Sequence, residues 1–207
     1  MNFLQLCQRL RQETGIADSG PAAVTGQTGD MKRLVDWVNE SWIRLQSSRQ
    51  DWAWLWANTS VTLTTGSHLV DIPTAVDKLV EITRDGAPLK QMDYADFRES
   101  YRTIGSGVPS VFAIRPDNKL IFNAEPTSDV TFAIEYYAKP SYFASGTASP
   151  ALPERFHMLI VWQALLEYAM FDEAPELSQK AQVNAAQLYA ELARDQSPEL
   201  SLPGALA

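Results

Sequence analysis

The 207-residue sequence has few of the side chains that most often carry catalysis, metal binding or covalent cross-links. It contains one cysteine, Cys7, and two histidines, His68 and His157, which lie far apart. A single cysteine forms no disulfide within the chain, and isolated histidines do not supply the closely spaced ligands of a metal site. We therefore predict a buried thiol in reducing surroundings, no bound metal and no cofactor.

Positive charge is also scarce. The chain has 17 Lys and Arg against 25 Asp and Glu, which gives a formal net charge of -8. Binding to phosphates requires clustered Lys and Arg, so this balance argues against a nucleic-acid groove built by one copy of the chain. An acidic surface would suit the lining of a passage through which DNA slides without sticking.

Long apolar runs are missing as well. The most apolar stretch, Met158 to Phe171, is interrupted by Gln163 and Glu167, and it is shorter than the roughly 20 residues that cross a bilayer. Residues 1–12 lack the continuous apolar run and the small-residue cleavage site of a signal peptide. We expect a buried helix, no membrane insertion and no secretion.

Catalytic motifs are not found in the sequence. The glycine-containing segment 26–32 resembles a phosphate-binding loop only loosely, because the glycine spacing and the Lys-Ser/Thr pair of that motif are missing. No nucleophile elbow occurs, and His157 beside Phe156 is interpreted as a structural histidine. We predict a protein that is not an enzyme and has no catalytic residues. A hydrolase with a dispersed active site is the least favoured alternative.

Helical patterns occur at both ends of the chain. Apolar residues at helical spacing predict two helices before residue 50 and two after residue 150, the later pair each opening on a proline. The predicted ranges are Asn2 to Glu13, Asp30 to Arg49, Pro153 to Phe171, and Pro175 to about Arg194. The first two are separated by a long loop, residues 15–29, with four glycines and a proline.

The middle of the chain changes to a period of two, which indicates β-strands. Turn residues between alternating segments predict three hairpins and a short helix capped by Asp93. The hairpins pair 60–64 with 68–72, 78–84 with 87–92 through Asp85-Gly86, and 110–115 with 119–123. A last strand follows with Val130, Phe132, Ile134 and Tyr136 on one face.

These elements predict an α+β fold in which the terminal helices must return to one another. We expect a split antiparallel helical bundle, residues 1–56 plus 150–195, that carries an inserted antiparallel β domain, residues 57–149. Residues 196–207 contain two prolines and form an extended tail. The tail cannot bury Leu200, Leu202 and Leu206 against itself, so it is either frayed or docked on another surface.

Three of the six tryptophans, Trp52, Trp54 and Trp56, lie within five residues. We interpret them as a buried junction between packed layers, because large aromatic side chains usually anchor such junctions. An aromatic binding platform is the alternative. A ligand- or carbohydrate-binding module would need these tryptophans, or the group Tyr136, Tyr137 and Tyr142, exposed together on one surface.

The N-terminal segment carries a resemblance to a known family. It reads NFLQLCQRLRQETGI, then SGPAAVTGQTGD, then MKRLVDWVNESWIRLQSSRQDWAWL. The leading helix, the Gly/Pro/Thr loop and the helix with a W-V-N-x-x-W pattern ending near Asp-Trp resemble the head-to-tail adaptor (connector) proteins of tailed bacteriophages. The rest of the chain agrees in the order of its elements.

The resemblance implies a structural virion protein that binds beneath the portal ring, usually as twelve copies, and extends the DNA channel toward the tail. Such a protein is made in the host cytoplasm, sits at the head-tail junction, contacts tail or nozzle proteins, and lets double-stranded DNA pass without specific binding. By position, the resemblance implies that the tail residues Leu200, Leu202 and Leu206 bind the portal. The loop residues Ala23, Val24 and Thr25 would contact a neighbouring subunit, and the loop would order only there. A tail-completion or tube-terminating protein is an alternative within the virion.

Overall fold

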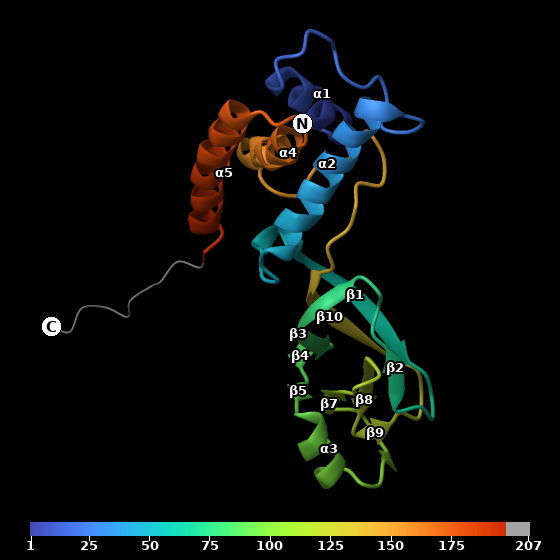
Figure 1. Cartoon of the computed structure of the whole chain (residues 1–207). Helices are drawn as coiled ribbons and strands as arrows, with labels where there is room; N and C mark the ends of the chain where they lie inside the picture. Colours follow the sequence, from blue (N-terminus) through green and yellow to red (C-terminus); the bar gives the residue numbers. More distant parts are fainter. Residues whose placement is uncertain (198–207) are drawn as a thin grey trace, which may run out of the picture. The chain divides into compact units, whose positions relative to one another are not determined.

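The computed structural model describes residues 1–197, which form two compact units. The helical unit contains residues 1–54 together with the described residues from Pro140 onward, and the β unit contains Leu55–Lys139 (Figure 1). The predicted α+β fold is confirmed, because helices from both ends of the chain flank a β region. Residues 140–149, which the sequence pattern assigned to the β domain, lie in the helical unit.

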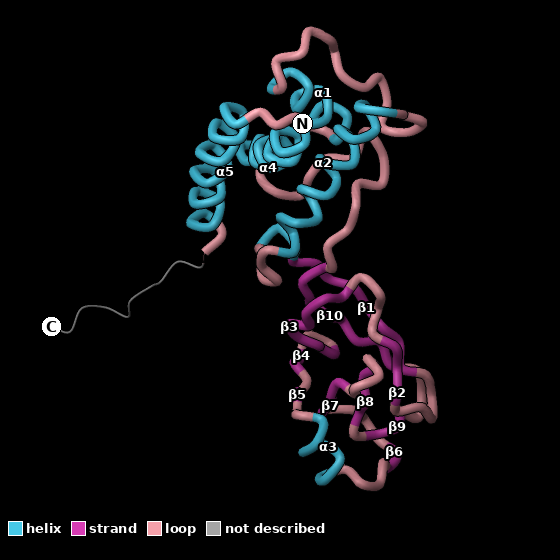
Figure 2. The backbone as a smooth tube through the Cα atoms, in the orientation of Figure 1, coloured by secondary structure: helices cyan, strands magenta, loops and turns pink. Residues whose placement is uncertain are grey.

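The helical unit is built around a central helix (Figure 2). Its helices are α1 (Phe3–Glu13), α2 (Gly29–Ser47), α4 (His157–Phe171) and α5 (Pro175–Asp195), with short 3-10 turns η1 (Ala53–Leu55) and η2 (Glu154–Phe156). Helix α4 packs against α1, α2 and α5. It is apolar nearly all round, as expected for a helix with neighbours on several sides. Pro153 leads into η2, so α4 begins later than the sequence pattern predicted.

The β unit contains two four-stranded sheets. Sheet A has the order β1 (Trp56–Leu63), β10 (Val130–Ala138), β3 (Val76–Arg84), β4 (Ala87–Pro88). Sheet B has the order β2 (Leu69–Asp71), β8 (Lys119–Phe122), β7 (Val111–Ile114), β5 (Lys90–Gln91). Two further short strands, β6 (Gly105–Ser106) and β9 (Ala124–Glu125), pair with one another. The pairs β5–β7 and β6–β9 are parallel, so the insert is mostly rather than wholly antiparallel.

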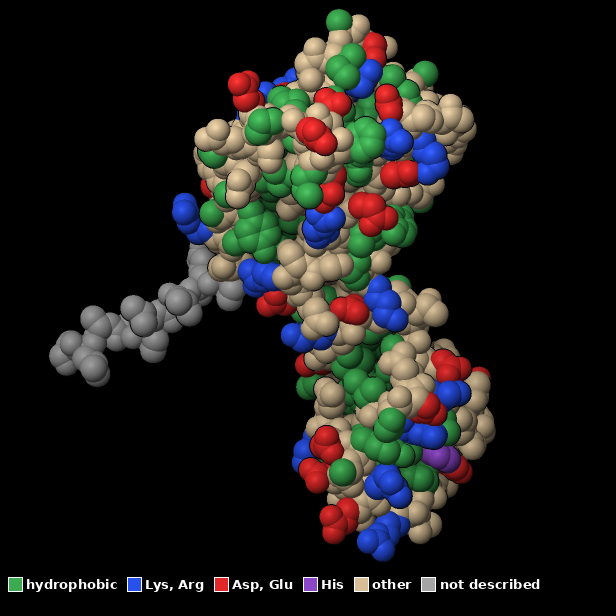
Figure 3. All heavy atoms as spheres, in the orientation of Figure 1, with side chains coloured by type: hydrophobic (Ala, Val, Ile, Leu, Met, Phe, Trp, Pro, Cys, Tyr) green, Lys and Arg blue, Asp and Glu red, His purple; other side chains and the backbone are tan. Residues whose placement is uncertain are grey.

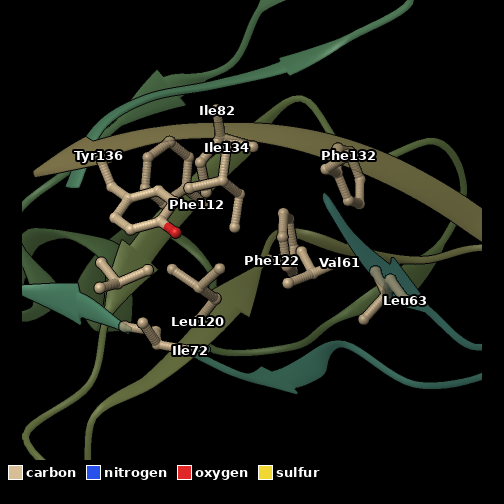
Figure 4. Close-up of a cluster of buried hydrophobic side chains, with 11 residues drawn as sticks. Val61, Leu63, Ile72, Ile82, Phe112, Leu120, Phe122, Phe132, Ile134 and Tyr136 are labelled. Atoms are coloured by element: carbon tan, nitrogen blue, oxygen red, sulfur yellow. The ribbon is translucent and has the colours of Figure 1, made fainter. Parts of the chain in front are cut away.

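The inner faces of the two sheets share one hydrophobic core (Figure 4). Alternate residues of each strand point into it, as the pleat of a strand requires. Sheet A contributes Val61, Ile82, Phe132, Ile134 and Tyr136, and sheet B contributes Phe112, Leu120 and Phe122. The rings of Phe122 and Phe132 stack across the core with centroids 4.7 Å apart.

A short helix, α3 (Tyr94–Ser100), covers the other face of sheet B. Phe97 is buried against Val111 and Ala113, whose strand neighbour Phe112 points into the core between the sheets. Asp93 caps α3 as predicted, because its Oδ1 accepts a hydrogen bond from the Ala95 amide at 2.8 Å. The β unit therefore has three layers: sheet A, sheet B and α3.

The first predicted hairpin is wrong. Strand β1 pairs with β10, and β2 pairs with β8 in the other sheet. The turn at Gly66 is present, but it carries the chain from one sheet to the other, where both strands can bury an apolar face in the shared core. Local alternation identifies strands but contains no information about which strand becomes the neighbour.

The other two predicted hairpins are present. Asp85 and Gly86 have φ angles of 51° and 79°, as a tight two-residue hairpin requires, although the ladder beyond them joins only two residue pairs. The chain then crosses to sheet B, where β5 pairs with β7. Strands β7 and β8 form the third hairpin, and Asn118 takes the left-handed conformation in its turn.

Candidate assembly surfaces

The segment that returns from the β unit, residues 140–150, packs along α2 and is termed the return segment. Ser141 exchanges two hydrogen bonds with the side chain of Gln46, at 3.0 and 3.1 Å. The Phe143 amide donates to Asn39 Oδ1 at 3.1 Å, and the Tyr142 hydroxyl donates to Glu40. These contacts explain why the return segment belongs to the helical unit although its composition suggests a free linker.

The same segment completes the start of α1. The first amides of a helix have no partner within the helix. Here Phe3 and Leu4 donate to the carbonyls of Ala148 and Gly146, at 2.8 and 3.0 Å. The capping box between Asn2 and Gln5 satisfies two more donors. The first turn of α1 is therefore held by residues of the return segment, which are distant in the sequence.

A row of aromatic rings joins the elements of the helical unit. Phe143 lies between Phe3 and Trp42, with ring centroids 4.6 and 5.3 Å away and near-parallel planes. The row continues from Trp42 to Trp54 at 5.2 Å and from Trp54 to Trp52 at 5.9 Å. These contacts link α1, the return segment, α2 and the residues that follow α2. The aromatic side chains thus join the two N-terminal helices to the segment that returns from the β unit.

The tryptophan cluster does not form an exposed platform. Trp52 is fully buried, and its Nε1 donates to the Leu45 carbonyl at 3.1 Å, whereas Trp56 is 46% exposed at the start of β1. The proposed tyrosine group is also divided. Tyr136 points into the sheet core, so its strand neighbour Tyr137 lies on the outer face. The arrangement a carbohydrate-binding module needs is therefore not formed by these residues.

The long loop between α1 and α2 is anchored by its own chain. The buried guanidinium of Arg11 donates to both carboxylate oxygens of Asp18 at 2.5 to 3.0 Å, and these hydrogen bonds hold the Asp18 pKa below its usual value. Gln8 Nε2 donates to the Pro21 carbonyl at 3.2 Å. The expectation that this loop orders only against a neighbour is therefore wrong.

The predicted contact residues of this loop differ in exposure. Ala23 and Thr25 are exposed, and Val24 is half-buried. Val24 lies so close to Gly146 that a Cβ there would come within 3.3 Å of Val24 Cγ2. The segment thus presents two side chains outward from a fixed position. Contact of Ala23, Val24 and Thr25 with another subunit stays a prediction.

An exposed apolar cluster lies where α4 ends, and we name it the α4 corner. It consists of Ile16, Trp37 and Phe171, which line one pocket; Phe171 is 54% exposed, and its chain neighbour Met170 is 74% exposed. The Arg33 guanidinium lies 4.3 Å above the Phe171 ring. Grouped apolar side chains at a surface usually mark a site of protein contact. The sequence did not identify this site, because α4 is apolar on every side and its pattern does not show which side chains remain uncovered.

Three further titratable side chains, His157, Cys7 and Asp172, have structural environments. His157 is buried, its Nε2 donates to the Leu152 carbonyl at 3.1 Å, and burial lowers its pKa. Cys7 is a buried free thiol whose pKa burial raises to about 12. Asp172 accepts from the Tyr168 hydroxyl at 3.0 Å. Among residues 1–197 there is no group of three or more His, Cys, Asp or Glu suited to a metal ion.

The sequence also led to expectations about surface charge, membrane-spanning helices and the C-terminal residues. Lys and Arg are interspersed with Asp and Glu on the face seen in Figure 3. In the part of the chain that the structure describes, no helix has the length and apolarity to cross a membrane. Helix α5 ends at Asp195, and the Ser197 hydroxyl closes its last turn on the Ala193 carbonyl at 2.7 Å. Leu200, Leu202 and Leu206 lie outside the described residues.

Comparison with known proteins identifies the family of the chain. The family model described as SU10 adaptor protein matches residues 1–205. No curated protein matches the chain. The match includes the helical unit, the β unit and nearly all of the C-terminal segment, so the chain belongs to the SU10 adaptor family of structural phage proteins.

Proposed function

We propose that this protein is a head-to-tail adaptor that assembles as a ring beneath the portal and extends the DNA channel toward the tail. The observation that carries the proposal is the family match over residues 1–205, which spans both structural units. The exposed apolar side chains where α4 ends also support a role in protein contact. The protein would catalyse no reaction.

The partners follow from the position of a head-to-tail adaptor in a virion. The portal protein would lie on one side and tail or nozzle proteins on the other, at the head-tail junction of a particle assembled in the host cytoplasm. We expect a homo-oligomer of twelve copies. Double-stranded DNA would pass through it without specific binding, which suits the net charge of -8 because like charges repel.

A ring requires heterologous contacts, in which one surface of a subunit meets a different surface of the next. The α4 corner and the outward residues Ala23 and Thr25 are two such surfaces in the helical unit. They offer apolar and small side chains that are exposed in the single chain. The portal contact is assigned to the C-terminal leucines Leu200, Leu202 and Leu206.

The experiment that tests the function combines the purified full-length protein with its portal ring. Native mass spectrometry and electron microscopy should detect a complex in which a second ring of this protein lies on the portal. Failure to bind the portal, together with stable binding to the tail tube, would contradict the adaptor proposal. That result would support the alternative of a tail-completion or tube-terminating protein.

A second set of variants tests the C-terminal segment in the same assay. Truncation after Ser197 leaves the last turn of α5 intact, and it should abolish binding to the portal. Replacing Leu200, Leu202 and Leu206 together by serine should have the same effect at full length, whereas Ser201→Ala should bind normally. Undiminished portal binding by both altered proteins would remove the proposed role of these leucines.

A further inference from the structure

The outward side chains of sheet A are exposed or half-buried along β1, β10 and β3. The ladder aligns its outward residues in rows across three strands. One row is Trp56, Tyr137 and Lys78, and the next is Asn58, Glu135 and Glu81. The inward rows between them fill the core that sheet A shares with sheet B. The face therefore has a fixed and regular arrangement of side chains.

Two carboxylates lie directly opposite one another on this face. Glu81 and Glu135 are register partners in the antiparallel pair β3–β10. Like charges in this position destabilise a sheet, whereas opposite charges stabilise it. Within residues 1–197 neither carboxylate has a hydrogen bond or an ion pair. A positively charged side chain from another molecule, placed between Glu81 and Glu135, would be attracted to both carboxylates and would offset their mutual repulsion.

Aromatic and aliphatic side chains lie near the two carboxylates, together with Asn58 and Lys78 of the same two rows. Trp56 in β1 is 46% exposed. Val80 in β3, on the other side of β10, is 45% exposed. Val80 is the extra residue of a β-bulge, since Glu135 pairs with Glu81 and Tyr136 pairs with Leu79. An acidic centre with aromatic and aliphatic neighbours fits a partner that presents arginine, whose guanidinium pairs with carboxylates and stacks on aromatic rings.

The opposite side of the β unit presents such arginines. Arg98, in α3, and Arg102, just after its end, line an open groove of about 650 Å³, and Asp96 is an exposed carboxylate of the same helix. The groove floor contains Phe97 and Ile121, and Glu99 is the third charged residue that lines it. Arg98 lies 5.9 Å from the Tyr94 ring centre, and Arg102 has no ion pair within the described residues.

These two surfaces lie on opposite outer layers of one rigid sandwich, because sheet B separates sheet A from α3. Surfaces on opposite sides cannot pair within one copy, but they can pair between successive copies of a ring. We propose that α3 of one copy docks on the outer face of sheet A of the next, with Arg98 and Arg102 meeting Glu81 and Glu135. This inference rests on the proposed ring and identifies a subunit contact within it.

Charge reversal on each surface tests the contact in the full-length protein mixed with its portal. The variant Arg98→Glu/Arg102→Glu should lose ring formation, and so should Glu81→Arg/Glu135→Arg, because like charges then face each other across the interface. An equimolar mixture of the two variants should form rings again, since alternating copies restore opposite charges at every contact. Asp117→Arg, in the turn between β7 and β8, is the control and should assemble normally.

The outcomes separate this contact from the proposed function. If the unmodified protein forms rings and either reversed variant assembles equally well alone, the contact is contradicted while the adaptor function stands. If only the Glu81→Arg/Glu135→Arg variant fails, and mixing does not restore it, the acidic face binds another protein and the second-copy proposal is overturned. If the unmodified protein forms no ring on the portal, both proposals fail.

Cross-linking provides an independent measurement. The chain has one native cysteine, which is buried, so introduced cysteines report on the interface alone. The variant Glu135→Cys/Arg102→Cys should give a ladder of covalent oligomers on oxidation in the presence of portal. The pair Glu176→Cys/Arg102→Cys is the control and should not. Rings that contain no cross-linked species for the first pair would contradict the proposed contact.

Discussion

Gln46 and Ser141 are joined by two reciprocal hydrogen bonds, in which the amide side chain of Gln46 pairs with the backbone of Ser141 as a strand would. Gln46 also donates to the carbonyl of Trp42 at 3.2 Å and is only 2% exposed. These hydrogen bonds fix the return segment on α2. In any other position of the segment, the buried side-chain amide of Gln46 would lose its partners on Ser141.

Replacing Gln46 by alanine should lower the free energy of unfolding by about 1–2 kcal/mol, since two partly buried hydrogen bonds with the Ser141 backbone are lost. The Gln46→Glu variant should be destabilised further, because a carboxylate cannot donate to the Ser141 carbonyl. Urea unfolding followed by circular dichroism measures both. Gln182→Ala on the exposed side of α5 is the control, and equal stabilities of Gln46→Ala and this control would contradict the prediction.

Phe143 should be a main stabilising residue of the return segment. Phe143→Ala removes a ring that stacks on both Phe3 and Trp42, and we expect a loss of about 2–3 kcal/mol together with a changed near-ultraviolet tryptophan signal. Phe143→Leu should recover part of that loss, because it restores apolar volume without stacking. Phe171→Ala at the α4 corner should change stability much less, since its ring is 54% exposed.

Stability should depend on pH through His157. Burial lowers its pKa from 6.5, so the folded protein favours the neutral ring while the unfolded chain takes up a proton more readily. Stability from this group is therefore complete above pH 6.5 and is lost as pH falls below that value toward the folded pKa. The thermal unfolding temperature, measured at closely spaced pH values from 8 to 5, should show this decrease in stability.

Two variants assign the effect to one histidine. His157→Asn should weaken the decrease in stability below pH 6.5, whereas His68→Asn, which alters the only other histidine, should retain it. The opposite result would contradict the assignment of the pH dependence to His157.

The ion pair of Arg11 with Asp18 should protect the long loop from proteolysis. Asp18→Asn removes the negative charge and one of the two oxygens that accept hydrogen bonds from the Arg11 guanidinium. A broad-specificity protease should therefore cut residues 15–28 faster. The Asp18 pKa is lowered by these hydrogen bonds, so the protection is present above pH 3.8 and is lost as pH falls below that value. Asp36→Asn, on the exposed side of α2, is the control for cutting rates.

The sequence was sufficient where the deciding interactions are local. The helices, the Asp93 cap, the Asp85-Gly86 turn and the Asn118 turn depend on residues within a few positions of one another, and all are present. Strand pairing depends on distant residues, and there the prediction for β1 and β2 was wrong. The resemblance of the N-terminal segment agrees with the family match over residues 1–205.

The candidate assembly surfaces were the least predictable feature. The exposed side chains of Met170 and Phe171 follow a run of buried apolar residues of the same type, and nothing in that run distinguishes them. The opposition of Glu81 to Glu135 needed the strand register, which a bulge at Val80 shifts by one residue. Side-chain exposure and strand register depend on how helices and strands pack against one another, so they cannot be read from single positions in the sequence.

The amino-acid sequence by itself determined the kinds of elements, their order and the scarcity of chemically reactive groups, because propensity, capping and composition act within one or two turns of chain. Only the tertiary structure decided that residues 140–150 belong to the helical unit, that β1 joins β10, and that acidic and arginine-bearing surfaces lie on opposite outer layers of the β unit. These features arise from contacts between residues far apart in the chain, where burial of apolar surface and pairing of polar groups choose among arrangements that local patterns leave equivalent.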